Sequence, residues 1–296
     1  MQIKRIAVIG TGNMGSPMAI NLAKAGFDVK VFDLVESKMQ AIAEHGITVC
    51  QSHQQAISNA EIVWTMLPTG VEVSDVFNNH LFNHCRSDCL LIDSSTIDLN
   101  YSREIHKAAA DRGFKMLDAP VSGGTVGAHN GALSFMVGGD VNSLPIAQAA
   151  FDAMGKTVVH CGECGMGQAA KMCNNLMLGI QMISVAEGFR LAQEVGLNEQ
   201  TLFDVATASS GDCFALRTFC PIPDLVETAP STKGFKPGFS SELMLKDLSL
   251  ALSAAKTAGI ELPFGDNAAE QYKSLVESGD SGMDFSSVIK LITKGP

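Results

Sequence analysis

Residues 6–34 read IAVIGTGNMGSPMAINLAKAGFDVKVFDL, and this stretch decides the fold of the first half of the chain. A short apolar run, typical of a buried strand, leads into Gly10, Gly12 and Gly15 in a G-x-G-x-x-G frame. A helical pattern follows, then a second strand pattern that ends at Asp33. A glycine loop between a strand and a helix, with an acid about twenty residues on, predicts a dinucleotide-binding βαβ unit.

Each glycine of the loop has a separate predicted task. Gly10 permits the tight turn, Gly12 lets a pyrophosphate approach the backbone, and Gly15 lets the helix pack closely on the strand. The pyrophosphate is expected on free N–H groups at the positive end of the helix dipole. A purely structural glycine turn and a methyltransferase-like nucleoside site are the alternatives. The cofactor contacts predicted in this loop are Gly10, Thr11, Gly12, Asn13, Met14 and Gly15.

Asp33 ends the second strand pattern, where a carboxylate can accept hydrogen bonds from the adenosine ribose hydroxyls. A 2′-phosphate at the same place would meet a like charge. The sequence therefore predicts NAD as the cofactor in preference to NADP.

Composition restricts the class of protein. The 296 residues carry a net charge of −10, which disfavours nucleic acid as a partner, and 46% of them are hydrophobic, which is enough for a real core. No apolar run reaches the roughly 18 residues that a membrane helix needs, and the start has no secretory signal. The expected location is the cytoplasm, or an organelle matrix if a transit peptide had been removed.

Cysteines and histidines indicate no metal site. Most of the eight cysteines are expected to be reduced and buried, because a chain of this length needs no disulfide framework. Cys161 and Cys164 form a C-x-x-C without a second pair at zinc spacing, so a plain loop is favoured over a zinc or redox site.

The chain divides by pattern into an α/β half and a helical half. Up to residue 162, β-branched runs alternate with amphipathic segments, which predicts a parallel sheet covered by helices on both faces. After 162 we find no convincing strand. A helix of about thirty residues is expected to start near residue 165, with further helices behind it. The predicted domains are therefore 1–162, a Rossmann domain, and 163–296, all-helical.

Within the second half, the helical patterns are NEQTLFDVATAS, SSELMLKDLSLALSAAKTAG, FGDNAAEQYKSLVESG and DFSSVIKLI. The segment 220–240, CPIPDLVETAPSTKGFKPGFS, holds four of the ten prolines and is predicted to be a long irregular loop. Loops of that length in compact domains are often functional.

Other candidate contact residues follow predicted strands, and ligands bind at the carboxyl ends of such strands. Leu67 and Pro68 follow one strand, and Ser94, Ser95 and Thr96 follow the next, although each turn alone can be an ordinary loop. Ser122, Gly123 and Gly124 follow another strand and suit a carboxylate, while a simple helix cap by Ser122 is equally compatible.

Lys171 and Asn175 are spaced to share one face of the long helix, between apolar neighbours. Loss of hydration lowers the pKa of a lysine and suits it to proton transfer. A lysine that extends its charged end to the surface from a helix end is the alternative, and these two residues alone favour it.

Four motifs together resemble the β-hydroxyacid dehydrogenase family, in its order and spacing and over almost the whole chain. They are IGTGNMGSPMAINLAKAG (9–26), DAPVSGGTVGAHNGALSFMVGG (118–139), GMGQAAKMCNNLMLG (165–179) and GFSSELMLKDLSLAL (238–252). The branch that acts on 3-hydroxyisobutyrate is the most similar. Phe214 and Cys220 depart from its pattern in the region that sets specificity, so the substrate is less secure than the type of reaction.

The resemblance implies a Rossmann domain joined by a long helix to an all-helical domain. The implied reaction is NAD-dependent oxidation of a short 3-hydroxy acid. The first candidate substrate is 3-hydroxyisobutyrate, an intermediate of valine catabolism. The implied catalytic residues are Lys171 and Asn175. The implied substrate contacts are Ser122, Gly123, Gly124 and Asp247. The implied cofactor contacts outside the glycine loop are Asp33, Leu67, Pro68, Thr96 and Lys246.

Rival functions stay open from the sequence. Reduction of tartronate semialdehyde or another short hydroxy acid would use the same residues. A non-catalytic NAD-binding protein is disfavoured because the lysine, the asparagine and the carboxylate loop are all present. An imine-reducing relative would be expected to lack the lysine. No metal is required, and the apolar faces of the long helix suggest a homodimer or homotetramer.

Overall fold

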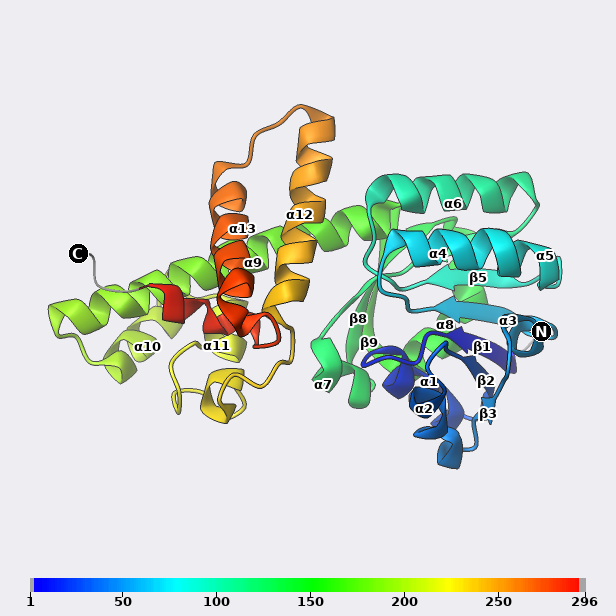
Figure 1. Ribbon diagram of the computed structural model, residues 1–296, viewed down its shortest axis with the longest axis horizontal. Helices are drawn as coiled ribbons and strands as arrows, with labels where there is room; N and C mark the ends of the chain where they lie inside the picture. Colours follow the sequence, from blue (N-terminus) through cyan, green and yellow to red (C-terminus); the bar gives the residue numbers. More distant parts are fainter. Residues whose placement is uncertain (1–2, 293–296) are drawn as a thin grey trace. The chain divides into compact units, whose positions relative to one another are not determined.

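The computed structural model describes residues 3–292 (Figure 1). The chain divides into two compact units, Met1–Lys171 and Met172–Pro296. The predicted boundary at residue 162 falls on the last residue of a strand, and the units divide later, inside the long helix that follows. The chain's own ends, 1–2 and 293–296, lie outside the described residues.

The first unit is built on a nine-stranded sheet in the order β3-β2-β1-β4-β5-β6-β8-β7, with β9 paired to β8. The strands from β1 to β6 pair in parallel. The strands are β1 (Arg5–Ile9), β2 (Asp28–Phe32), β3 (Thr48–Val49), β4 (Ile62–Thr65), β5 (Leu90–Asp93), β6 (Lys115–Asp118), β7 (Val121–Ser122), β8 (Leu133–Gly139) and β9 (Gly155–Gly162).

The expectation of a purely parallel sheet is wrong at one edge. Strand β8 runs antiparallel to both β6 and β7, and β9 is parallel to β8. Alternation of apolar runs with helices gives no strand direction where the connection is short, and the short α7 and its turn lead from β7 back to β8.

Helices cover both faces of this sheet, as predicted (Figure 1). Alternate residues of β1 enter different cores, with Ile6 and Val8 in one and Ala7 and Ile9 in the other, as the period of two in a strand requires. The helices are α1 (Gly15–Lys24), α2 (Glu36–Gln40), α3 (His53–Ile57), α4 (Gly70–Val76), α5 (Phe82–His84), α6 (Leu99–Asp111), α7 (Gly124–His129) and α8 (Leu144–Met154).

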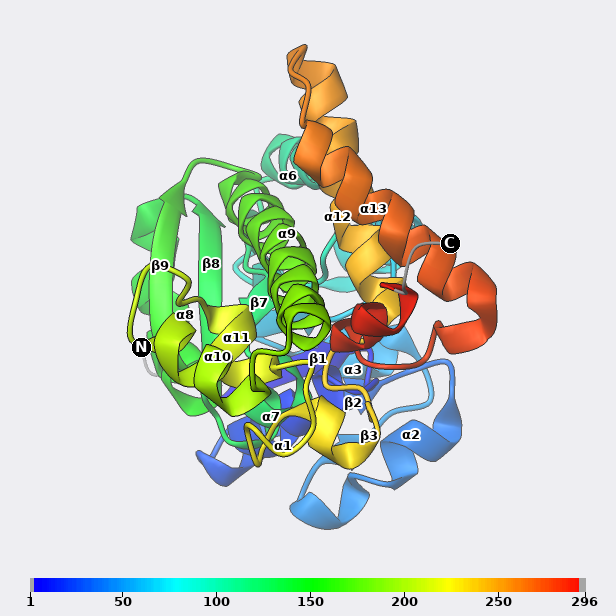
Figure 2. The same ribbon diagram turned by 90° about the vertical axis from the view of Figure 1, so that its left-hand side faces the viewer.

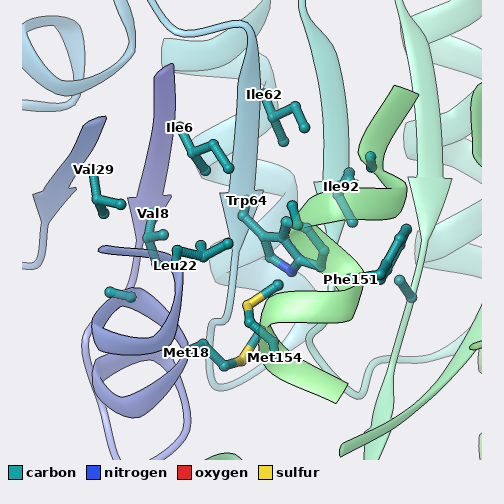
Figure 3. Close-up of a cluster of buried hydrophobic side chains, with 14 of the residues drawn as sticks. Ile6, Val8, Met18, Leu22, Val29, Ile62, Trp64, Ile92, Phe151 and Met154 are labelled. Carbon is teal, nitrogen blue, oxygen red and sulfur yellow. The ribbon is translucent and has the colours of Figure 1, made fainter. Parts of the chain in front are cut away.

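The core on the α1 and α8 side is built around Trp64 of β4 (Figure 3). Its ring meets Phe151 of α8 edge-on, with centroids 5.0 Å apart, and its Nε1 donates to Ser94 Oγ at 2.8 Å. Strands β4 and β5 are parallel neighbours in the sheet, and the loops that carry candidate site residues begin at their carboxyl ends.

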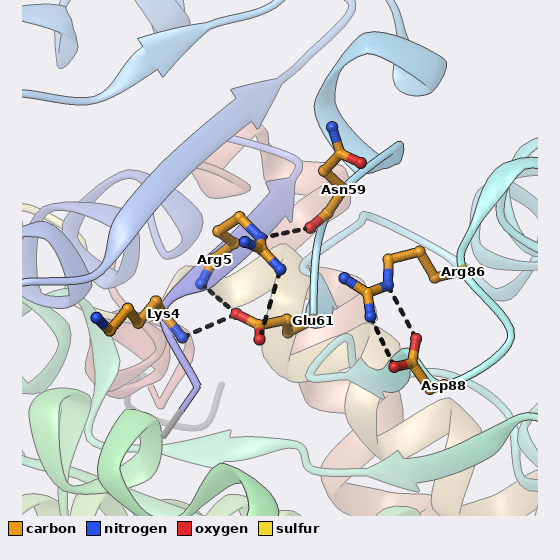
Figure 4. A network of polar contacts seen from close by, with 6 residues as sticks. All are labelled: Lys4, Arg5, Asn59, Glu61, Arg86 and Asp88. Atoms are coloured by element: carbon orange, nitrogen blue, oxygen red, sulfur yellow. Dashed lines mark hydrogen bonds and ion pairs between the residues drawn. The ribbon is translucent and has the colours of Figure 1, made fainter. Parts of the chain in front are cut away.

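Glu61 anchors the opposite, amino-terminal ends of the strands (Figure 4). Its Oε2 accepts from the backbone N–H groups of Lys4 and Arg5, both at 2.9 Å, immediately before β4 begins. These bonds stabilise the charged carboxylate and lower the pKa of Glu61. This network lies at the end of the sheet away from the candidate site.

The second unit is helical around α9 (Met166–Val195), which begins in the first unit. Helices α12 and α13 run side by side (Figure 2) and form one core with Met182 and Ile183 of α9. The remaining elements are α10 (Glu199–Thr207), α11 (Phe214–Phe219), α12 (Ser241–Ala258), α13 (Pro263–Leu275), the π-helical turn Val276–Asp280 and the 3-10 helices Pro230–Lys233 and Phe285–Leu291.

The pattern of the second half is largely confirmed. In residues 163–292 the only β pairing is an isolated bridge between Ser240 and Asp284. Segment 220–240 is irregular apart from the 3-10 turn, as expected. The last helical pattern, DFSSVIKLI, is a 3-10 helix (Phe285–Leu291), and Asp284 caps it by accepting from Ser286 N.

Candidate active site

The glycine loop follows β1 and shows three different local environments. Gly10 has a φ of 94°, and a Cβ there would collide with the Met66 carbonyl oxygen. A Cβ on Gly15 would collide with the Gly10 carbonyl oxygen, so the start of α1 presses on the turn. Apart from Gly12 and its two chain neighbours, no protein atom lies within 4 Å of a Cβ built on Gly12, which leaves that side of the loop open to a ligand. These environments fit the predicted tasks of turn, packing and ligand approach.

A hollow of about 320 Å³ opens beside this loop. Its lining includes Lys38 of α2 and Thr125 and His129 of α7. The hydroxyl of Thr11, which also lines it, is buried and has no hydrogen-bond partner among the described residues. Asn13 of the loop completes a polar rim. A buried hydroxyl without a partner and a nearby lysine fit a phosphate-bearing group.

Asp33 lies directly after β2 and is tied into the glycine loop. Its Oδ2 accepts from the backbone N–H of Thr11 at 2.7 Å, and its Oδ1 accepts from Val35 N at 2.8 Å. An ionised carboxylate has about four acceptor positions, so ribose hydroxyls can still bind. Asp33 therefore holds the loop in addition to its predicted contact with the ribose.

The loops after β4 and β5 are joined through Ser95. Its hydroxyl accepts from Leu67 N at 2.8 Å and donates to Asp93 Oδ1 at 2.6 Å. Burial raises the pKa of Asp93 to about 6, against the hydrogen bonds from its neighbours that lower it. Pro68 is exposed, whereas Leu67 and Thr96 are half-buried. The two loops that carry the predicted cofactor contacts are thus joined to each other by the hydrogen bonds of Ser95.

The Ser122–Gly124 segment ends β7 and begins α7. Gly123 has a φ of 127° and Gly124 one of 59°, values that disfavour any side chain. Gly123 occupies the cap position of α7, and no side chain caps that helix. Ser122 pairs with Ser134 in the ladder. Helix capping by Ser122 is therefore absent, and its hydroxyl stays a candidate for the substrate carboxylate.

Lys171 and Asn175 lie one turn apart on α9, and both side chains are buried, with 8% and 1% exposed. A surface lysine, the simpler alternative, does not match this burial. Asn175 Nδ2 donates to Asp247 Oδ2 at 2.5 Å, and Asp247 of α12 also pairs with Lys246 at 3.7 Å. The buried Asp247 carboxylate thus orients Asn175.

Sequence reasoning missed three buried polar residues beside these sites. Asp118 at the end of β6 accepts from Gly165 N at 2.8 Å and from Gln168 N at 2.9 Å, so it caps α9. His106 Nε2 lies 3.0 Å from the same carboxylate. Gln168 bonds the loop after β5. A polar residue that ends an otherwise apolar strand, such as Asp118, was the available signal.

The cysteines differ in burial, and this differs from the expectation. Cys50, Cys89 and Cys220 are buried, whereas Cys164 and Cys173 are exposed and the other three are half-buried, so the expectation that most are buried is wrong. All eight are free. In residues 3–292 there is no cluster of three or more histidine, cysteine or acidic side chains that could hold a metal ion.

No helix in the described part of the chain is long and apolar enough to cross a bilayer. The cytoplasmic location and the homo-oligomer stay predictions.

Comparison with known proteins identifies both halves of the chain. Residues 5–162 match the family model described as the NAD binding domain of 6-phosphogluconate dehydrogenase. Residues 165–292 match the model described as NAD-binding of NADP-dependent 3-hydroxyisobutyrate dehydrogenase.

Individual relatives match over nearly the whole length. The chain is 45% identical over 284 residues to a probable 3-hydroxyisobutyrate dehydrogenase of Mycobacterium tuberculosis, with 96% of each sequence covered. It is 42% identical over 291 residues to an NAD-dependent L-serine dehydrogenase of Pseudomonas aeruginosa, with 98% of each covered. A solved structure of the M. tuberculosis 3-hydroxyisobutyrate dehydrogenase with L-serine superposes with a TM-score of 0.94 at 44% identity. That comparison covers 99% of this chain and all of the other.

The fold and these matches define an oxidoreductase with an NAD-binding Rossmann domain followed by a helical domain. More narrowly, the chain belongs to the β-hydroxyacid dehydrogenase family, close to the 3-hydroxyisobutyrate dehydrogenases. The sequence predictions of family, fold class and cofactor are confirmed at this level.

Proposed function

We propose that the protein oxidises 3-hydroxyisobutyrate to methylmalonate semialdehyde with NAD, a step of valine degradation. The observation that carries this proposal is the buried pair of Lys171 and Asn175 on α9, with Asn175 held by the Asp247 carboxylate. A buried lysine on a rigid helix, beside an oriented amide, is suited to accept a proton from a substrate hydroxyl.

When bound, NAD supplies the hydride acceptor, and the chain's own residues supply position and proton transfer. Lys171 is the proposed general base that takes the hydroxyl proton during oxidation and returns it during reduction. Asn175 orients the hydroxyl. The Ser122–Gly124 loop holds the carboxylate and so determines which carbon faces the nicotinamide.

The role given to Asp247 is narrower than the one first expected. Its carboxylate is buried and already has Asn175 and Lys246 as partners. Direct contact with an anionic substrate would bring two like charges together in a buried place, which is unfavourable. We therefore assign Asp247 to the orientation of Asn175, and Lys246 to the cofactor side as before.

L-serine is the second candidate substrate, because the chain is similar to an L-serine dehydrogenase at 42% identity. Both molecules carry a hydroxymethyl group on the carbon next to the carboxylate. They differ in another substituent of that carbon, a methyl group or an ammonium group. Tartronate semialdehyde, the third candidate, is a product-side relative with a hydroxyl group there. The same lysine, asparagine and carboxylate loop would serve all three.

Initial rates decide among these substrates. NADH formation from 3-hydroxyisobutyrate, L-serine and glycerate, and NADH consumption with tartronate semialdehyde, are measured with the same enzyme. The proposal expects the highest kcat/KM with 3-hydroxyisobutyrate. A higher kcat/KM with L-serine transfers the assignment to that amino acid, and no turnover with any of them favours a non-catalytic NAD-binding protein.

A further inference from the structure

Gln168 joins the loop after β5 to the first turn of α9. Its side-chain Nε2 donates to the Ser95 carbonyl oxygen at 2.7 Å, and its Oε1 accepts from Ile97 N at 3.2 Å. These two backbone groups belong to the peptide units on either side of Thr96. The amide therefore hydrogen-bonds the backbone on both sides of Thr96, and the Gln168 side chain is fully buried.

The helix end of this contact is itself fixed. Asp118 accepts from the backbone N–H of Gln168 at 2.9 Å and from Gly165 N at 2.8 Å, which caps α9 from a neighbouring strand. His106 of α6 braces the same carboxylate at 3.0 Å. A capped first turn does not fray, so the direction of the Gln168 side chain is set by the sheet.

Lys171 lies three residues after Gln168, on the adjoining part of the same helix face. The Ser95 hydroxyl extends the network to Leu67 N and Asp93. The backbone of two predicted cofactor loops and the helix that carries the proposed base are thereby joined by one chain of buried hydrogen bonds.

We propose that Gln168 is a positioning residue for hydride transfer, because it clamps the Thr96 loop to the turn of α9 that precedes Lys171. This inference rests on the proposed role of Lys171. The task needs a donor and an acceptor at the end of a side chain of this length. Glutamate has the length without the donor when ionised, and methionine has neither polar group.

The first variant is Gln168→Met, which keeps the volume and leaves two buried backbone groups without their partner. A displacement of about 1 Å can cost as much as about a hundredfold in rate, so we expect kcat to fall at least about tenfold. The KM for the hydroxy acid should stay within about twofold, because the Ser122 loop is untouched. Circular dichroism confirms that the variant is folded.

The second variant, Gln168→Glu, gives a readout that a merely structural role would not move. When ionised, the introduced carboxylate faces the Ser95 carbonyl oxygen, acceptor against acceptor, whereas the protonated acid donates to it. Burial and the carboxylates of Asp93 and Asp118 raise the pKa of the introduced group. His106 and Lys171 are the other titratable neighbours, and they are present in both proteins. The ratio of the variant's kcat to that of the unaltered enzyme should therefore rise as the pH is lowered.

The control is Gln54→Glu, the same change at an exposed position of α3, which should give a constant ratio near one. A folded Gln168→Met enzyme with unaltered kcat overturns the inference. So does a Gln168→Glu ratio that does not change with pH, and this arm decides alone if the methionine variant does not fold. A Lys171→Ala enzyme with normal turnover instead removes the proposed function.

Discussion

Asp33 illustrates at the scale of one residue how a recognition side chain also serves the fold. Both of its oxygens accept backbone N–H groups, from Thr11 and Val35. Its negative charge is held against the glycine loop and cannot swing aside when a 2′-phosphate approaches. We therefore expect the choice between NAD and NADP to depend on this fixed charge.

We expect NAD to be preferred over NADP by at least about tenfold in kcat/KM, which corresponds to roughly 1.4 kcal/mol. Asp33→Ala should narrow this gap and weaken both cofactors, since the loop loses its anchor. Asp33→Asn is the control, because it keeps one acceptor for the loop and removes the charge. It should also reduce the preference for NAD, with a smaller fall in kcat/KM for NAD than Asp33→Ala causes. Equal kcat/KM for both cofactors in the unaltered enzyme would contradict the role of Asp33.

The placement of single residues was predictable where a local motif fixes it. The three glycines and Asp33 fall within one βαβ unit, and the spacing of Lys171 and Asn175 already shows that they share a helix face. Gln168 and Asp118 could not be assigned. Their partners are 71 and 50 positions away in sequence, on other elements. Such tasks exist only after the sheet has formed.

Strand β5 ends in Asp93, a buried carboxyl group. Burial raises its pKa from 3.8 to about 6, so the folded protein favours the neutral form. Because the pKa of Asp93 is higher in the folded than in the unfolded protein, its contribution to the free energy of unfolding is fully present below pH 3.8. That contribution is lost as the pH rises through about 6. The whole loss is roughly 3 kcal/mol.

Asp93→Asn should remove that contribution while keeping an acceptor for Thr65 and Ser95. The Tm of the unaltered protein minus the Tm of the variant, measured by calorimetry, should decrease as the pH is raised from about 4 to about 6.5. Roughly 2–4 °C is expected for each kcal/mol. Other titrating groups cancel because both proteins contain them. A difference that is independent of pH would contradict the raised pKa.

Elements were predictable to the extent that apolar periodicity defines them. Every strand pattern before residue 162 corresponds to a strand, because β-branched runs between turn residues have few alternatives. The direction of β8 was not predictable, since periodicity carries no information on pairing. The 3-10 geometry of the final segment does not follow from its helical pattern; Asp284, which caps it, also accepts from Gly238 N and Phe239 N of a segment 45 residues earlier.

At the scale of the whole molecule, α9 exposes three large apolar side chains on one face, with Gln181, Ser184 and Gly188 between the first and the second. Met177, Leu191 and Val195 are 56%, 64% and 70% exposed. Their spacings are close to whole helical turns, so they lie on one face. Exposed large apolar side chains that share one helix face favour a protein–protein interface.

We expect a homodimer or homotetramer through this face of α9. Light scattering coupled to size exclusion should give at least twice the chain mass of 31.3 kDa. Leu191→Glu should shift the mass towards the monomer, because a charge in an apolar interface loses its hydration. Val71→Glu, at a similarly exposed position of α4, should leave the mass unchanged. A monomer at micromolar concentration would exclude the predicted interface.

The whole account depends on Lys171 as the proton acceptor, and one measurement tests it most directly. The turnover of Lys171→Ala is compared with that of the unaltered enzyme, while calorimetry follows NAD binding and circular dichroism follows folding. General acid–base catalysis contributes about 10²–10⁴-fold, so kcat should fall by about that factor with NAD binding retained. Lys171→Arg should not restore it, because a guanidinium stays protonated. A folded Lys171→Ala protein that binds NAD and keeps more than about a tenth of kcat would contradict the account.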